Sequence, residues 1–70
     1  MANPEWPRVS AHLNRTFQTK AIALKPRQGV SDSMEVYMAD EFLGTVYIDE
    51  DEGEVSYHFE MAILDIDLEN

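Results

Sequence analysis

The side chains best suited to chemistry in this sequence are carboxylates, and they concentrate in one short segment. Residues 49–54 read Asp-Glu-Asp-Glu-Gly-Glu, and Glu60 stands at the twelfth position counted from Asp49, a spacing typical of calcium-binding loops. However, Gly53 comes one position early for the sharp turn, and the flanking segments resemble strands rather than helices. We therefore predict a solvated acidic patch, with weak divalent-metal binding through residues 49–54 as an alternative. The patch comprises Asp49, Glu50, Asp51, Glu52, Glu54 and Glu60.

Other catalytic or ligating side chains are scarce. His12 and His58 are the only histidines, and no spacing fixes them as a pair of metal ligands. Cysteine is absent, and no serine lies in a strand–turn–helix elbow. We therefore expect no catalytic residue, no dedicated metal site and no cofactor, so that the protein is not an enzyme.

Charge divides the chain into two unlike parts. The five basic residues all lie within residues 1–30, whose single acid is Glu5, whereas residues 31–70 contain the other 13 acids and neither lysine nor arginine. Because the net charge is −9, direct binding of nucleic acid is disfavoured and a basic protein partner is permitted. No apolar run is long enough to span a membrane, and no signal peptide is expected, which favours a cytoplasmic location.

Seventy residues correspond to one domain, and its first element has a helical pattern. Apolar residues recur at spacings of three and four, which place them on one face of a helix over residues 4–17. Asn3 followed by Pro4 is typical of an N-cap and a first helical position. The apolar face comprises Trp6, Val9, Leu13 and Phe17.

The remainder of the chain has the alternation expected of strands. We predict strands over residues 20–25, 33–39, 42–48 and 54–60, with a loop from Pro26 to Ser33. The short connections favour an α+β fold, in which the helix packs on one face of a four-stranded antiparallel meander (αββββ). Residues 61–68 are expected either to extend the last strand or to form a short helical turn.

Two details of strand pairing follow from the apolar pattern. A two-residue turn at Asp40-Glu41 would place Val36 opposite Thr45, so an odd-length loop or a bulge is expected there. In the last hairpin, Val46 is predicted to pair with Tyr57, and Gly44 with Phe59.

The predicted sheet leaves apolar residues on the face away from the helix. We expect the helix to cover Phe42 and its neighbours, and the opposite face to present an interaction surface rich in aromatic residues. The alternative is that residues 61–68 fold back over it. The interaction surface comprises Tyr37, Leu43, Tyr47 and His58.

A family resemblance accompanies this pattern from Glu35 onward. The motifs are Glu-Val-Tyr at 35–37, Asp-Glu-Phe-Leu-Gly at 40–44, Ser-Tyr-His-Phe-Glu-Met-Ala-Ile-Leu-Asp at 56–65, and Asp-Leu at 67–68. They resemble a small alphaproteobacterial family of uncharacterised proteins, known only as a domain of unknown function. The chain departs from that family at His58 and Glu60, where amide side chains are usual. The resemblance implies a compact intracellular protein and assigns no activity.

These observations favour a non-enzymatic protein-interaction or assembly module that self-associates through the Tyr37 face or binds an unidentified protein. A second hypothesis is an acidic regulator that docks on a basic partner through the acidic patch. A third is the weak divalent-metal binder. Neither nucleic acid nor a membrane is an expected partner.

Overall fold

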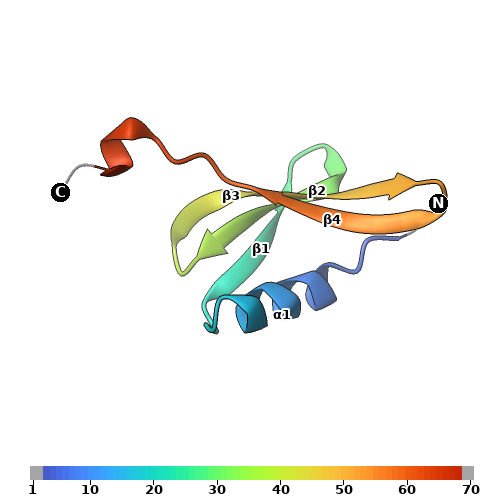
Figure 1. Ribbon diagram of the computed structural model, residues 1–70, viewed down its shortest axis with the longest axis horizontal. Coiled ribbons are helices and arrows are strands. Elements are labelled where there is room, and N and C mark those ends of the chain that lie inside the picture. The colour runs from blue at the N-terminus through green and yellow to red at the C-terminus, as the bar shows by residue number, and fades with distance from the viewer. Residues whose placement is uncertain (1–2, 69–70) are drawn as a thin grey trace.

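The computed structural model describes residues 3–68 and shows a helix that lies against one face of a four-stranded sheet (Figure 1). The strands pair antiparallel in the order β1-β2-β3-β4, which confirms the predicted αββββ fold. No helix in this part of the chain combines the length and the apolar character that crossing a membrane requires. Residues 1–2 and 69–70 of the predicted domain lie outside the described part. The elements are α1 (Trp6–Thr16), β1 (Ile22–Arg27), β2 (Val30–Met38), β3 (Glu41–Asp51), β4 (Glu54–Glu60) and the 3-10 helix η1 (Asp65–Leu68).

Helix α1 begins at Trp6, two residues later than predicted, and Glu5 replaces Asn3 as the N-cap residue. An N-cap carbonyl accepts the first helical hydrogen bond from the residue four positions ahead. For Asn3 that residue is Pro7, which has no N–H group, so a helix capped at Asn3 would lack its first backbone hydrogen bond. The Glu5 carbonyl instead accepts from Val9 N at 3.0 Å.

The segment predicted as a loop between the first two strands is a hairpin with a register shift, in which Arg27 pairs with Val30 and Pro26 pairs with Met34. β1 continues through Pro26 to Arg27, and β2 begins at Val30, which leaves only Gln28 and Gly29 in the turn. Pro26 is tolerated because β1 lies at the edge of the sheet, where an N–H group facing outward has no strand partner.

The predicted bulge between the second and third strands is confirmed. The turn consists of Ala39 and Asp40, and the register shifts so that Val36 pairs with Gly44 while Tyr37 pairs with Phe42. The extra residue is Leu43, which packs against the core cluster. The bulge therefore exchanges the predicted positions of Phe42 and Leu43: Phe42 contacts Tyr37, with ring centroids 5.6 Å apart.

The predicted register of the last hairpin was wrong by two residues. Val46 pairs with Phe59 rather than Tyr57, because both strands extend into the acidic segment and Asp51 pairs with Glu54. The connection contains only Glu52 and Gly53, with φ values of 52° and 83°. Two positive φ values in succession are typical of a two-residue hairpin turn that matches the twist of the strands.

Gly44 makes room for backbone rather than for the predicted aromatic ring. A Cβ atom at Gly44 would collide with the carbonyl oxygen of Glu60 and would lie 3.0 Å from the Cα atom of Met61. The backbone at the end of β4 therefore occupies the space beside Gly44.

A small core lies between α1 and the sheet. Partly buried apolar side chains surround it, including Trp6 and Val9 from the predicted helix face. Phe17 is more exposed, at 52%, but contacts Phe59 edge to face. Among residues 3–68, the buried apolar residues are Leu13, Ile22, Val36 and Val46.

Residues 61–68, the C-terminal arm, project beyond the end of the sheet instead of folding back over it (Figure 1). The molecule is correspondingly elongated, with extents of 44 × 24 × 23 Å. The alternative in which this segment covers the sheet face was therefore wrong. The predicted short helical turn is present as η1.

Candidate interaction surfaces

The sheet face opposite α1, called the outer face, carries three of the four residues predicted for interaction. Tyr37 and Tyr47 are partly buried there, and His58 is exposed. Tyr47 pairs across the strands with His58, and their rings stack with centroids 5.3 Å apart. Leu43 is not with them, because the bulge directs it to the core, and Phe42 takes the place beside Tyr37.

A polar row divides the outer face into two aromatic pairs. Lys25, Glu35, Thr45 and Glu60 follow one another across the four strands. This row lies between the Tyr37–Phe42 pair and the Tyr47–His58 pair. The outer face is therefore a mixed surface rather than one continuous apolar patch.

Tyr37 is held by its neighbours on this face. Its hydroxyl group donates a hydrogen bond to Glu35 Oε1 at 3.1 Å, and Lys25 Nζ lies 4.3 Å from its ring centroid. The hydrogen bond to Glu35, with smaller contributions from desolvation and from the Glu35 charge, raises the pKa of Tyr37 above 10.0. The contacts with Glu35 and Lys25 hold the ring in place.

The acidic patch lies at the tip of the β3–β4 hairpin, except for Glu60, which is at the far end of β4. Several of its carboxylates line a shallow hollow of about 370 Å³ together with His58. His58 Nε2 lies 3.7 Å from Asp49 Oδ2 and 3.0 Å from Ser56 Oγ. Within residues 3–68, no group of three or more acidic or histidine side chains is arranged to hold a metal ion. Docking of the patch on a basic protein stays a prediction.

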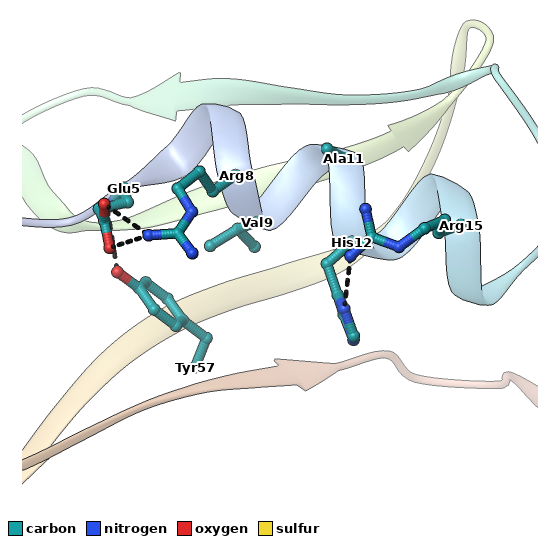
Figure 2. Close-up of a pocket in the computed structure, with 7 residues that line it drawn as sticks. All are labelled: Glu5, Arg8, Val9, Ala11, His12, Arg15 and Tyr57. Carbon is teal, nitrogen blue, oxygen red and sulfur yellow. Dashed lines mark hydrogen bonds and ion pairs between the residues drawn. The ribbon is translucent and has the colours of Figure 1, made fainter.

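A second hollow, the helix groove, lies between α1 and β4 and has a volume of about 440 Å³ (Figure 2). One side is formed by α1 and the other by the ring of Tyr57, whose hydroxyl group accepts a hydrogen bond from Glu5 N at 3.0 Å. Trp6 packs edge to face on the same ring, with centroids 5.6 Å apart. The lining residues are Glu5, Arg8, Val9, Ala11, His12, Arg15 and Tyr57.

The helix groove combines apolar and basic character. Val9 lies between the Arg8 end and the His12–Arg15 end, as Figure 2 shows. Arg8 pairs with Glu5 at 3.1 Å but remains 80% exposed. Arg15 Nη2 lies 3.5 Å from His12 Nδ1, and no ion pair with a carboxylate is formed by Arg15 among the described residues. The groove is therefore a cationic surface in an acidic protein.

The C-terminal arm is the most exposed apolar segment in the described part of the chain. Asp67 stabilises its local turn: the Asp67 N–H group donates to the Leu64 carbonyl at 2.8 Å, and Leu64 N donates to Asp67 Oδ2 at 3.1 Å. Since these bonds are internal, they order the arm without attaching it to the sheet. Its exposed apolar side chains are Met61 (51%), Ile63 (66%), Leu64 (58%), Ile66 (69%) and Leu68 (66%).

The sequence predictions missed the helix groove, although part of its signal was present. Arg8, His12 and Arg15 are separated by four and three residues, a spacing that aligns them along one side of a helix. The contribution of Tyr57 could not be inferred from such spacing, because it depends on which strand lies beside α1.

A family model described as "Protein of unknown function (DUF3126)" matches residues 5–67, which is nearly the whole chain. The chain therefore belongs to this family, and the predicted resemblance to an uncharacterised family is confirmed at that level. The alphaproteobacterial group named with it stays a prediction. Neither a curated protein nor a solved structure gives a significant match.

Proposed function

We propose that this member of the DUF3126 family is a non-enzymatic assembly module that self-associates by burying its C-terminal arm. The supporting observation is that five apolar side chains of residues 61–68 are each more than half exposed. Full burial of one such side chain contributes about 1.5–3 kcal/mol. An apolar segment that projects from a small domain is typical of a protein–protein contact.

The arm supports this function better than does the sheet face that the sequence predicts. The outer face has lost Leu43 to the core and is crossed by the polar row through Lys25 and Glu35. The arm, in contrast, has neighbouring apolar residues that its own domain leaves uncovered. Self-association through the outer face is kept as the competing arrangement.

Sedimentation velocity tests the proposal. We expect the wild-type protein to form a dimer as its concentration rises, and a variant with Ile63→Ser, Ile66→Ser and Leu68→Ser to remain monomeric. Circular dichroism should show the same fold in both proteins, since these side chains lie outside the core. A wild-type monomer at all concentrations would rule out self-association.

Two control variants locate the contact. Val30→Ser removes an exposed apolar side chain from the β1–β2 hairpin and should leave the dimer intact. Phe42→Ser removes the exposed ring of the outer face, which is 53% exposed. Loss of the dimer with Phe42→Ser but not with the arm variant would contradict the role of the arm and favour the outer face.

A further inference from the structure

The structure contains a binding surface and a segment whose chemistries complement each other. The helix groove offers Val9 and Ala11 between basic side chains, and the arm offers apolar side chains interspersed with Asp65 and Asp67. Both surfaces are open in the single chain. We propose that the arm of one copy docks in the helix groove of a second copy, an inference that rests on the proposed self-association.

Charge favours this pairing over other sites on the molecule. Residues 31–70, which include the arm, contain no lysine or arginine, and the groove contains two of the five basic residues in the chain, Arg8 and Arg15. Arg15 is directed at His12 rather than at a carboxylate, so an incoming Asp65 would meet a guanidinium group that is still available. Lys25 on the outer face instead lies over Tyr37 and pairs across the strands with Glu35.

The apolar part of the contact involves the same groove. Val9 and the Tyr57 ring are only partly buried in the single chain, and Ala11 is exposed. Covering them with Ile66 and Leu68 removes apolar surface on both partners from water. The ring of Tyr57 is already fixed by Glu5 and Trp6, so it forms a preorganised wall.

The direction of the arm favours a second copy over the same chain. Residues 61–68 leave the end of β4 and extend away from α1, so reaching their own groove would require a reversal of direction (Figure 1). Each copy has one arm and one groove. Reciprocal exchange therefore satisfies both arms in a two-fold dimer, which closes the assembly at two copies.

Complementary charge reversal tests the docking directly. Arg15→Glu creates an acidic groove, and Asp65→Lys creates a basic arm; Asp67 is kept because it stabilises the turn at Leu64. Each variant alone places like charges together at both contacts of its homodimer, so we expect dimer affinity to fall about tenfold or more. In an equimolar mixture, both contacts are complementary, and affinity should return to within about threefold of wild type.

A matched control reverses a charge outside the groove. Lys20 lies in the α1–β1 connection, so Lys20→Glu should leave the affinity of its own homodimer unchanged, and it should recruit the Asp65→Lys protein into mixed dimers less strongly than Arg15→Glu does. Dimers that persist in both charge variants, or a mixture that regains no affinity, would overturn arm–groove docking while leaving self-association intact. A monomeric wild-type protein would overturn both.

A cysteine pair distinguishes exchange between copies from closure within one copy. The natural chain has no cysteine, so disulfides in an Ala11→Cys and Ile66→Cys double variant involve only positions 11 and 66, and the two single-cysteine variants, oxidised separately, show how far like positions join in a dimer. After mild oxidation, a non-reducing gel should show a covalent dimer. A cross-linked monomer would show that the arm folds into its own groove and would overturn exchange between copies.

Discussion

Asn14 binds both backbone groups of Ile22 and thereby joins the helix to the first strand. Its Oδ1 accepts from Ile22 N at 2.9 Å, and its Nδ2 donates to the Ile22 carbonyl at 3.0 Å. Nδ2 also donates to the Ser10 carbonyl at 3.1 Å. Because Ile22 is one of the four buried apolar residues in the described part of the chain, the Asn14 side chain fixes the strand that carries part of the core.

We expect Asn14→Ala to lower the free energy of unfolding by about 1–3 kcal/mol, since partly buried backbone groups of Ile22 lose their partners. Urea denaturation measures the change. Ser10→Ala is the matched control: its hydroxyl donates to the same carbonyl at a longer 3.5 Å, and Asn14 remains to satisfy that carbonyl. Equal losses in the two variants would contradict the special role of Asn14.

Gly44→Ala should destabilise the protein by about 1–3 kcal/mol, the usual effect of forcing extra volume into a packed site. The new methyl group would meet the Glu60 backbone, which cannot rotate away as a side chain could. Gly29→Ala serves for comparison. Nothing lies within 4 Å of a Cβ atom at Gly29, so only the positive φ of 75° makes an alanine unfavourable there. The prediction fails if thermal unfolding ranks Gly29→Ala as the more destabilising change.

Ala39→Gly should stabilise the protein by about 0.5–1 kcal/mol. Ala39 has a φ of 54°, where a Cβ atom is disfavoured and glycine is not. Ala23→Gly is the matched control in β1, where ordinary strand geometry makes glycine destabilising by about 0.5–1 kcal/mol. In denaturant unfolding, changes in stability of opposite sign for the two substitutions would confirm backbone strain at Ala39. A loss of stability in both variants would contradict it.

The raised pKa of Tyr37 predicts a pH dependence at the alkaline end. Since its pKa is higher folded than unfolded, the stabilising contribution is complete below about pH 10.0 and is lost as the pH rises through the folded pKa. Tyrosine ring signals followed by NMR should place Tyr37 above that value, and Glu35→Gln should lower the pKa of Tyr37. Glu54→Gln, on another hairpin, should leave it unchanged. An unshifted pKa of Tyr37 in Glu35→Gln would contradict the assigned cause.

The cross-strand pair Asp51–Glu54 places two like charges opposite each other beside the Glu52-Gly53 turn. Glu54→Lys should therefore stabilise the hairpin by about 0.2–1 kcal/mol at low salt, and the gain should shrink at high salt. Glu41→Lys, which lies opposite the uncharged Met38, controls for the change in net charge. An equal gain from both substitutions would attribute the effect to net charge alone.

Apolar periodicity predicted the fold and most of the strand faces, but it did not predict every register. The apolar pattern required a bulge near Val36, because regular pairing across the predicted turn would have placed this buried residue opposite Thr45. The pattern could not show which β3 residue would be the extra one, so Phe42 and Leu43 were each predicted on the wrong face of the sheet. The β3–β4 register was missed because Asp49–Asp51 lacks any apolar alternation. There, only the Glu52-Gly53 turn specifies which residues pair.

The apolar residues of the arm also show what a sequence pattern leaves open. Ile63, Leu64 and Ile66 indicate that the segment needs cover. Their pattern does not specify whether that cover comes from the same chain, and the structure leaves them exposed. The exposed arm is therefore a stronger candidate for the interaction surface than the sheet face.

The sequential order of the sheet has a consequence for how the chain folds. Every strand pairs with the next one along the chain, and each connection between strands contains only two residues. Since no distant segments must meet to form the sheet, it can grow hairpin by hairpin with little entropy lost to loop closure. We therefore expect rapid single-exponential refolding, with any concentration-dependent association appearing as a separate and slower phase.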